Sequence, residues 1–597
     1  MTAETWPSLV AMFFEQAASK GNAPFMWAKH DGKYRPTSWR QAADEVVEVA
    51  RGLRRMGIKD GDRVVLVSEN RPRWVVADLA IMAAGAITVP AYTTNTTADH
   101  KHIIENSGAK GAIVSTGKLA DAFLPAAHDA TEMDFTVTLE QPKLQQGLHV
   151  EVLGWDDLKR KGAGASYDPM AESAKFTRRD RCCIIYTSGT GGAPKGVVLS
   201  HGAILCNCVG ARDTLIKLGL GDEVFLSFLP LSHAYEHAAG IYFPISIGAE
   251  IYFAEGVETL QTNLAEVRPT IMTAVPRLYE TLHTRILRGV KKTGGTTEKL
   301  FHRAVDLGTK RYYDPRSLTL GERLQDKVLD MLVRRKVAGR FGGRLKAMVS
   351  GGAPLNPDIG LFFTALGLLI LQGYGQTEAA PVIAVNQPEN NKLDTVGTPL
   401  TGVEVRIADD GEILVRGELL MEGYWRNDEA TAEALRGGWL HTGDVGIIDA
   451  DGLLKITDRK KDIIVNSGGD NLSPQRVEGL LTLEPEIAQA MVYGDKRPHL
   501  VGLLVPDPEW MHDWARAHKR TNSLGVLAED PDFTKALAAA IERVNKKVAG
   551  IEKVRRFMVA REDFTIENEQ LTPTMKIRRH VIKKVYGDRL EALYSKK

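Results

Sequence analysis

The stretch that decides the fold is a glycine-rich loop behind a short apolar run, and it reads Tyr186-Thr187-Ser188-Gly189-Thr190-Gly191-Gly192-Ala193-Pro194-Lys195-Gly196-Val197. The apolar run before it, Cys182 to Ile185, is typical of a buried strand. Glycine tolerates the dihedral angles that turn several backbone N–H groups toward one anion, while hydroxyls and a lysine add further donors. The stretch therefore predicts a strand that feeds an anion-binding loop, with a flexible surface turn as the alternative.

Two familiar phosphate loops are excluded by the residues around the lysine. The Walker loop has a glycine before its lysine and Ser or Thr after it, whereas Lys195 stands between Pro194 and Gly196. The dinucleotide fingerprint needs a third glycine where this chain has Pro194. Any nucleotide must therefore be held in a different way.

Length and composition bound the remaining possibilities. A chain of 597 residues exceeds the usual size of one core, so we expect at least two domains. The net charge of +1 gives no global field that favours nucleic acid. The residues from Met1 to Trp27 lack the apolar core of a signal peptide, and the longest apolar stretch, Ile359 to Leu371, is too short to span a bilayer.

The four cysteines, Cys182, Cys183, Cys206 and Cys208, have no zinc-site spacing. Buried free thiols in a reducing compartment are the expected state. We therefore expect a cytoplasmic protein, or one on the inner face of a membrane.

The N-terminal third alternates helix and strand. The spacing of Ser38 and Gln41 predicts a capping box that opens a helix, which Gly57 could end. Further predicted elements are a strand over Val64 to Val67, a helix over Trp74 to Ala84 and a strand over Ile87 to Val89. Short apolar strands between amphipathic helices favour a parallel sheet, with ligands at the carboxyl ends of its strands.

Later segments differ in character. Residues 282–346 are rich in lysine and arginine, and leucine and valine recur at helical spacing between Leu320 and Val337. This pattern indicates a solvated helical face or, alternatively, a basic surface for anionic lipid or CoA phosphates. From Val396 to Ile456, short alternating runs and Asp-Gly turns predict a small β subdomain. We expect a hinge after Asp458 and a small α+β domain beyond it, with a helical stretch from Asp532 to Val548.

Four further motifs follow the glycine-rich loop along the chain: Ser350-Gly351-Gly352-Ala353-Pro354, Gly373-Tyr374-Gly375-Gln376-Thr377-Glu378, Trp439-Leu440-His441-Thr442-Gly443-Asp444, and Leu571-Thr572-Pro573-Thr574-Met575-Lys576. Together with the loop they resemble the AMP-forming adenylating enzymes, which include acyl-CoA synthetases, peptide-synthetase adenylation domains and luciferases. The usual loop of that family is YTSGTTGxPKG, and Gly191 replaces its second threonine here. The resemblance covers nearly the whole chain.

The resemblance implies a site that binds ATP, later AMP. Its expected nucleotide-binding residues are Thr187, Ser188, Gly189, Thr190, Gly191, Gly192, Lys195, Gly351, Gly352, Ala353, Pro354, Gln372, Gly373, Tyr374, Gly375, Gln376, Thr377, Asp444, Arg459, Lys461 and Lys576. Mg²⁺ would be held by Thr190 and Glu378. Lys576, Thr377, Glu378 and His233 are the expected catalytic residues, with His233 as a gate or wall of the acyl pocket or simply a core histidine.

The resemblance also implies the architecture. We expect a large α/β N-terminal domain over residues 1–460, made of parallel-sheet subdomains and a small β subdomain. A smaller, mobile α+β domain over residues 461–597 would carry the catalytic lysine. Lys461 falls at the expected hinge.

The implied reaction converts a carboxylic acid and ATP into an acyl-adenylate, and then into acyl-CoA, AMP and pyrophosphate. The basic segment before Gly351, the segment Val275 to Glu280 and the run Leu571 to Thr574 resemble the long-chain fatty acyl-CoA synthetase branch. Medium-chain or aryl acids, transfer to a carrier protein in trans, a luciferase-like oxygenation and a non-catalytic nucleotide- or lipid-binding relative remain alternatives. Peripheral membrane contact through residues 282–346 and a homodimer are also open.

Overall fold

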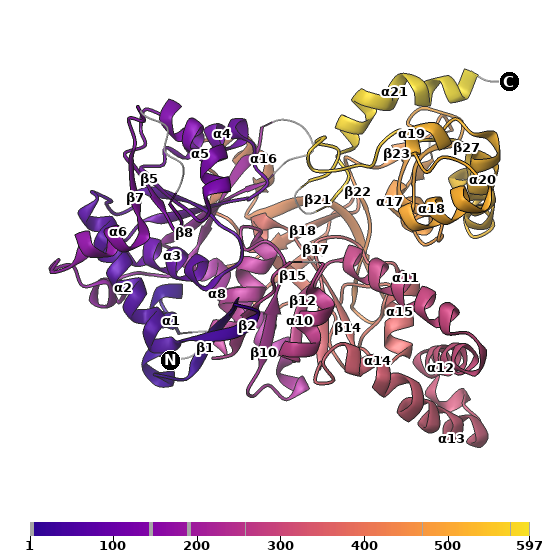
Figure 1. Cartoon of the computed structure of the whole chain (residues 1–597), viewed down its shortest axis with the longest axis horizontal. Helices are drawn as coiled ribbons and strands as arrows, with labels where there is room; N and C mark the ends of the chain where they lie inside the picture. The colour runs from indigo at the N-terminus through magenta and orange to yellow at the C-terminus, as the bar shows by residue number, and fades with distance from the viewer. Residues whose placement is uncertain are drawn as a thin grey trace.

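The computed structural model describes residues 5–141, 147–187, 193–256, 258–468, 470–572 and 575–595. Two large sheets, a small β subdomain, a helical arm and a C-terminal domain make up this part of the chain (Figure 1). The α/β class with a C-terminal α+β domain, expected from the sequence, is confirmed. Within the described residues, no helix has both the length and the apolar character needed to cross a bilayer.

The first sheet has eight strands in the order β19-β9-β8-β4-β3-β5-β6-β7. Its strands are β3 (Arg63–Val67), β4 (Ile87–Ala91), β5 (Gly111–Val114), β6 (Phe135–Thr138), β7 (Glu151–Gly154), β8 (Arg181–Thr187), β9 (Lys195–Ser200) and β19 (Gly423–Tyr424). The strands from β8 to β7 run parallel, as predicted, whereas β9 is antiparallel to both β8 and β19. The helices of this region are α2 (Trp39–Arg55), α3 (Pro72–Ala83), α4 (Thr97–Ser107), α5 (Gly117–Asp129), α6 (Trp155–Gly162) and α7 (Pro169–Ser173).

Helix α2 illustrates how local sequence sets an element. The Ser38 hydroxyl accepts from the backbone of Gln41, and the Gln41 side chain reaches back to the backbone of Ser38, which completes the predicted capping box. Ala42, Val46 and Leu53 form the buried stripe. The prediction of this helix from its cap and its periodicity is confirmed.

The second sheet has nine strands in the order β16-β15-β14-β13-β12-β10-β11-β1-β2. Its strands are β1 (Pro24–His30), β2 (Lys33–Ser38), β10 (Val224–Ser227), β11 (Glu250–Phe253), β12 (Ile271–Ala274), β13 (Ala347–Ser350), β14 (Ile370–Gly375), β15 (Val382–Val385) and β16 (Thr398–Pro399). Around it lie α1 (Leu9–Lys20), α8 (His201–Leu215), a π-helix η2 (Glu236–Tyr242), α9 (Phe243–Ser246), α10 (Leu260–Val267) and α15 (Pro357–Ala365). The apolar stretch from Ile359 to Leu371, expected as one core element, spans two elements, the end of α15 and the start of β14.

The basic segment forms a helical arm beside the second sheet (Figure 1). It consists of α11 (Pro276–Thr293), α12 (Gly295–Tyr313), a short 3-10 turn η3 (Pro315–Ser317), α13 (Leu320–Leu329), a π-helical stretch η4 (Asp330–Arg334) and α14 (Arg335–Arg340). The helical character predicted for residues 282–346 is therefore confirmed.

The β subdomain predicted between Val396 and Ile456 is a five-stranded antiparallel sheet. Its elements are β17 (Glu404–Ile407), β18 (Glu412–Arg416), α16 (Asp428–Ala434), β20 (Leu435–Arg436), β21 (Trp439–Ile448) and β22 (Leu454–Arg459).

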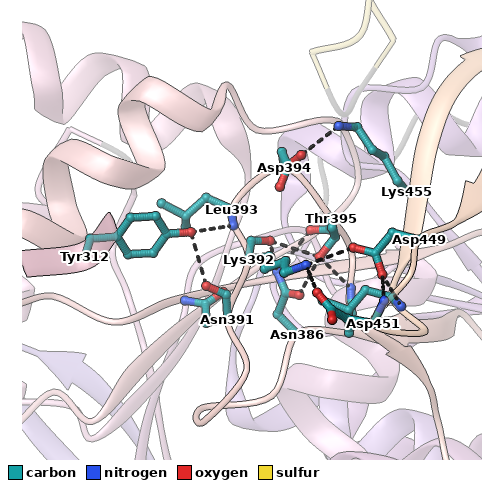
Figure 2. A network of polar contacts seen from close by, with 12 residues as sticks. Tyr312, Asn386, Asn391, Lys392, Leu393, Asp394, Thr395, Asp449, Asp451 and Lys455 are labelled. Carbon is teal, nitrogen blue, oxygen red and sulfur yellow. Dashed lines mark hydrogen bonds and ion pairs between the residues drawn. The ribbon is translucent and has the colours of Figure 1, made fainter. Parts of the chain in front are cut away.

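A loop of residues 386–395 fastens this β subdomain and the helical arm to the second sheet (Figure 2). The Leu393 N–H donates to the Tyr312 hydroxyl of α12 (3.1 Å), and Lys392 pairs with Asp449 (3.1 Å) in the turn before β22. Lys455 of β22 pairs with Asp394 of the same loop (2.6 Å). The loop is thereby tied to β22 and to the turn before it, and β22 pairs with the strand that carries Asp444.

The C-terminal domain has its own core around a three-stranded sheet of β25, β26 and β27. Its elements are β23 (Ile464–Val465), β24 (Asn471–Leu472), α17 (Pro474–Leu481), β25 (Ile487–Tyr493), β26 (Leu500–Pro506), α18 (Pro508–Ala517), α19 (Leu524–Leu527), α20 (Pro531–Asn545), a 3-10 turn η6 (Gly550–Glu552), β27 (Val554–Val559) and α21 (Arg579–Ser595). Helix α20 occupies the helical stretch expected from Asp532 to Val548. The polar contacts of this domain with α11 include Arg288 to Asp507 (2.6 Å) and Arg277 to the Ala488 carbonyl (3.0 Å).

Candidate active site

The glycine-rich stretch lies at the tip of the β8–β9 hairpin. Thr187 pairs directly with Lys195 across the two strands, so β8 ends and β9 begins on the two flanks of the stretch. The prediction that a buried strand feeds this loop is confirmed. Ser188, Gly189, Thr190, Gly191 and Gly192 lie outside the described residues.

Lys195 and Glu378 converge on one aromatic ring. The Lys195 ammonium lies 4.9 Å from the ring centroid of Tyr424 in β19. The Tyr424 hydroxyl donates to Glu378 Oε1 (2.8 Å), and the backbone N–H of Met421 donates to the Glu378 carbonyl (2.9 Å). Glu378 and Thr377 stand on a short 3-10 turn, η5 (Thr377–Ala379), directly after β14.

Sequence reasoning missed Tyr424. The signal was weak, because Tyr424 belongs to a two-residue edge strand that pairs with β9 only through the fold. The structure makes it the link between the lysine of one sheet and the acid of the other.

Asp444 is the centre of a buried polar cluster. It is 4% exposed and stands opposite Arg459 across strands β21 and β22. Arg459 Nε donates to Asp444 Oδ1 (2.8 Å), and the Tyr374 hydroxyl donates to Oδ2 (2.7 Å). A carboxylate has about four lone-pair sites, so each oxygen can still accept a further hydrogen bond.

The Gly351 segment is shaped by close packing. A Cβ on Gly351 would lie 2.9 Å from the ring of Tyr235, whose hydroxyl donates to the Val349 carbonyl (2.8 Å). Gly352 has φ +84°, a conformation that favours glycine. Gly352, Ala353 and Pro354 are exposed, so this turn is open to solvent.

The residues of strand β14 are held by hydrogen bonds and close packing, whereas Gln376 in the turn after it has a side-chain nitrogen without a partner in the described residues. Gln372 is buried, and its side chain accepts from the Leu355 N–H (3.2 Å) and donates to the Leu393 carbonyl (2.6 Å). The Gln372 side chain is therefore engaged in holding neighbouring loops. Gly373 and Gly375 pair with β15, and a Cβ on Gly375 would collide with the Pro381 carbonyl. The Gln376 amide nitrogen is buried and has no hydrogen-bond partner in the described part of the chain.

Lys576 reaches this cluster from the C-terminal domain. A tight turn holds it, in which the Thr572 N–H donates to the Lys576 carbonyl (2.8 Å) and the Lys576 N–H donates to Thr572 Oγ1 (3.0 Å). The residue keeps contact with solvent, yet protein crowds around its amine. This desolvation lowers the pKa of Lys576 to about 8, with repulsion from Arg459 adding to it and attraction to Asp444 and Glu378 opposing it. The charges of these three residues of the large domain therefore act on the Lys576 amine.

The charge of Lys576 also acts on His233. Its Nδ1 accepts from the Tyr235 N–H (3.2 Å). Burial, aided by repulsion from Lys576, lowers the pKa of His233 to about 3, so the imidazole is neutral at physiological pH. Such a group can line a pocket but is a poor general acid.

Glu236, three residues further along, received no role from the sequence. It is fully buried and accepts hydrogen bonds from the hydroxyls of Ser227 (2.6 Å) and Thr273 (2.6 Å). Burial raises the pKa of Glu236 to about 7 despite these bonds. It ties the start of the π-helix η2 to strands β10 and β12, beneath the ring of Tyr235.

Lys461 lies at the tip of the turn that leads from β22 into the C-terminal domain. The Lys460 N–H donates to the Gly443 carbonyl (2.9 Å), and the Asp462 N–H donates to the Arg459 carbonyl (2.9 Å). The side chain of Lys461 is exposed. The Ile463 N–H also donates to the Arg459 carbonyl (3.1 Å), so Lys461 lies within a hydrogen-bonded turn between the two domains.

The donor set fits a magnesium ion that is shared with phosphates. No cluster of three or more His, Cys, Asp or Glu suited to a metal occurs among the described residues. Mg²⁺ is usually bound by one or two protein carboxylates and by substrate phosphates, and the second oxygen of Glu378 supplies such a ligand. Thr190, the other expected ligand, lies outside the described residues.

Known proteins resemble this chain over most of its length. The model of the AMP-binding enzyme family matches residues 13–425, and that of the AMP-binding enzyme C-terminal domain matches residues 461–597. A long-chain-fatty-acid–CoA ligase of Mycobacterium bovis is 35% identical over 99% of this chain and 97% of its own length. The peroxisomal long chain acyl-CoA synthetase 7 of Arabidopsis thaliana is 32% identical over 94% of this chain and 82% of its own length.

Solved structures share the fold at lower identity. The adenylation domain of a carboxylate reductase from Mycobacterium chelonae has a TM-score of 0.78 at 22% identity, covering 99% of this chain and 91% of its own. The anthranilate CoA ligase AuaEII in complex with anthranoyl-AMP has a TM-score of 0.73 at 20% identity, with both chains fully covered. With its full-length relatives and its match to both family models, this chain belongs to the AMP-binding enzyme family.

Proposed function

We propose that this protein is an AMP-forming acyl-CoA ligase whose acid substrate is a long-chain fatty acid. The family and the names of the full-length relatives support ligation of an acid to CoA. The preference for a long chain is the finer part of the proposal and draws on relatives at 32–35% identity. The observation that carries the proposal is the buried cluster of Asp444, Arg459 and Tyr374, whose charged members act electrostatically on Lys576.

In the first half-reaction, one oxygen of the acid's carboxylate attacks the α-phosphorus of ATP, and the bond to pyrophosphate breaks. The two reactants are both anions and repel each other. An ammonium from Lys576 between them relieves that repulsion and stabilises the charge that develops on phosphorus. Thr377 would donate to an α-phosphate oxygen, and Lys195 would meet the outer phosphates.

The nucleoside would be held by the polar cluster and the glycine turn. Asp444, already oriented by Arg459 and Tyr374, would accept the ribose hydroxyls through its remaining lone pairs. The exposed backbone from Gly351 to Pro354 would lie along the adenine. Glu378 would hold Mg²⁺, which neutralises phosphate charge when bound.

In the second half-reaction, the thiol of CoA attacks the acyl carbon, AMP leaves with the bonding electron pair, and the thiol proton is released to solvent. Lys576 must first withdraw, because it fills the space that the thiol needs. A swing of the domain over residues 461–597 about Lys461 would remove it and present the loop of residues 466–471. That loop is braced by Asn466 Oδ1, which accepts from the N–H groups of Gly468 (2.8 Å) and Asp470 (2.9 Å).

The test of the proposal is ATP–pyrophosphate exchange measured with a series of saturated fatty acids of increasing length, with benzoate as an aryl acid for comparison. A ligase of long chains gives exchange that rises with chain length, and AMP release that requires added CoA. Exchange with benzoate alone would contradict the long-chain part. AMP release that required a pantetheinylated carrier protein, and did not respond to CoA, would contradict the proposal that CoA accepts the acyl group.

A further inference from the structure

Helix α13, at the end of the helical arm, turns its apolar face toward solvent instead of toward the core. Leu320, Leu324 and Val328 repeat every four residues and so share one helix face, and they are 83%, 68% and 43% exposed. Met331 (58% exposed) and Leu332 (43%) continue the run into η4. A helix of a soluble domain normally turns such a face toward the core. We call these five residues the apolar stripe.

The inward face of the same helix is held by an ion pair. Asp326 is buried and accepts from Arg334 Nη2 (2.6 Å). Arg334 is also buried and donates to the carbonyls of Ala304 in α12 (2.9 Å) and Ala365 at the end of α15 (2.7 Å). Rolling the stripe inward would break this network and leave buried charges without partners, which is costly. The outward direction of the apolar stripe is therefore built into the fold.

The flanks of the stripe are basic. Arg323 and Lys327 each lie three residues after a stripe leucine, and both are exposed, as is Lys336 in α14. None of these three has an acidic partner in the described residues. The nearby acids are engaged elsewhere, since Glu322 pairs with Lys310 (2.8 Å) and Asp330 with Arg335 (3.6 Å).

We propose that α13 docks this protein onto the surface of a bilayer that contains anionic lipid. An apolar face bordered by lysine and arginine is the pattern of helices that lie in the membrane interface, where the basic side chains reach the headgroups. A helix of ten residues is about 15 Å long, which is too short to span a bilayer but long enough to lie along one.

The basic residues beside the apolar stripe favour an anionic bilayer, and not a second copy of the chain, as the partner of α13. A two-fold contact through the apolar stripe would bring Arg323 and Lys327 of both copies together, with the nearby acids already paired. Figure 1 shows α13 at the outer end of the arm, on the side away from the C-terminal domain. Docking there leaves that domain free to move.

The experiment is flotation of the full-length protein with vesicles of phosphatidylcholine alone or of phosphatidylcholine mixed with phosphatidylglycerol. The apolar variant is Leu324→Gln/Val328→Gln, and the charge variant is Lys327→Gln/Lys336→Gln. Matched controls on α21 are Val585→Gln, at a residue that is 55% exposed, and Lys584→Gln. ATP–pyrophosphate exchange and thermal melting check that each variant is folded.

We expect the wild type to float with the mixed vesicles, and to do so less as salt is added. The apolar variant should lower the partition constant about tenfold or more on both kinds of vesicle. The charge variant should lower it roughly tenfold or more on the mixed vesicles only, since each basic residue contributes about a fivefold gain there. The two control variants should bind as the wild type does.

The proposal is overturned if the wild type stays at the bottom of the gradient with the mixed vesicles, or if Val585→Gln loses as much binding as the apolar variant. It is also overturned if light scattering finds a wild-type dimer that the apolar variant turns into a monomer, because the stripe would then join two copies. None of these outcomes depends on which acid the protein activates.

Discussion

At the scale of single residues, Asp444 connects the parts of the site. Its two oxygens accept from Arg459 and Tyr374, which belong to different sheets. The sequence motif indicated the aspartate and its arginine. It could not show that the tyrosine two residues from Gln376 would be the second donor, because that contact joins strands that lie 70 residues apart.

The first prediction concerns this carboxylate. Asp444→Asn replaces one of the two carboxylate oxygens by an NH2 group. That group would point its donors toward Arg459, Tyr374 or the ribose, each of which needs an acceptor. We expect the Kd for ATP to rise about tenfold or more, since an unmatched buried polar contact costs ~1–3 kcal/mol. The measurement is binding of ATP and of 2′,3′-dideoxy-ATP to both proteins. The wild type should prefer ATP, and a variant that kept this preference would remove Asp444 from the ribose.

The second prediction concerns the proton on Lys576. Its pKa of about 8 in the nucleotide-free protein lies below the ordinary lysine value of 10.5. The phosphates of ATP favour the charged ammonium and so raise this pKa on binding. Above pH 8, binding must therefore take up a proton, and by linkage the affinity for ATP must fall as the pH rises through that window.

Calorimetry in buffers of different ionisation enthalpy measures this uptake directly. At pH 8.5 the wild type should take up part of a proton when it binds ATP, and Lys576→Ala should take up less. Equal proton uptake by the two proteins would show that Lys576 does not approach the phosphates.

The third prediction concerns the glycine that packs on Tyr235. Gly351→Ala places a Cβ 2.9 Å from that ring, so the turn or the ring must shift. We expect a loss of ~1–3 kcal/mol in the free energy of unfolding, together with weaker ATP binding. Gly289→Ala is the control, because that position has open space around it in helix α11. Denaturant unfolding should separate the two, and an equally stable Gly351→Ala would argue that the packing is loose.

At the scale of elements, the sequence predicted a helix and its buried face correctly where the capping signal, the apolar periodicity and the packing all agreed. Helix α2 has a capping box and an apolar stripe that faces the core, so both signals gave the same answer. Helix α13 has an equally regular stripe, but Asp326 and Arg334 fix that face outward. A periodic pattern predicts that a helix forms. It does not predict whether the apolar face points to the core or to solvent, because that depends on contacts with residues distant in sequence, such as the bond from Arg334 to the Ala365 carbonyl.

The fourth prediction belongs to the turn between β22 and β23. Lys461→Pro fixes φ and stiffens the proposed pivot. Adenylation should stay within about twofold of the wild type, while thioester formation from supplied acyl-adenylate falls about tenfold or more, because the domain swing limits that step. Lys461→Ala keeps the backbone free and should leave both half-reactions near the wild type. Rapid-quench assays of each half-reaction measure the two rates, and normal CoA transfer in the proline variant would remove the pivot from Lys461.

At the scale of the whole molecule, the family resemblance anticipated the α/β domain, the β subdomain and the C-terminal domain because five motifs occur in one order. It did not anticipate how the domains touch. The contacts of Arg277 and Arg288 with the C-terminal domain come from the helical arm, whose sequence gave only charge and periodicity. The ion pair of Arg288 with Asp507 is partly exposed and contributes on the order of 0–1 kcal/mol, so it would oppose the proposed domain swing only weakly.

The central claim is that Lys576 serves the first half-reaction only. The measurement that tests it most directly is a comparison of both half-reactions in Lys576→Ala, with Lys584→Ala as the control lysine on the same domain. We expect ATP–pyrophosphate exchange to fall about 10²–10³-fold in Lys576→Ala, as when one charge-stabilising group is removed from a transition state, and thioester formation from supplied acyl-adenylate to stay near the wild-type rate. An equal loss in both half-reactions, or unchanged exchange, would contradict the account.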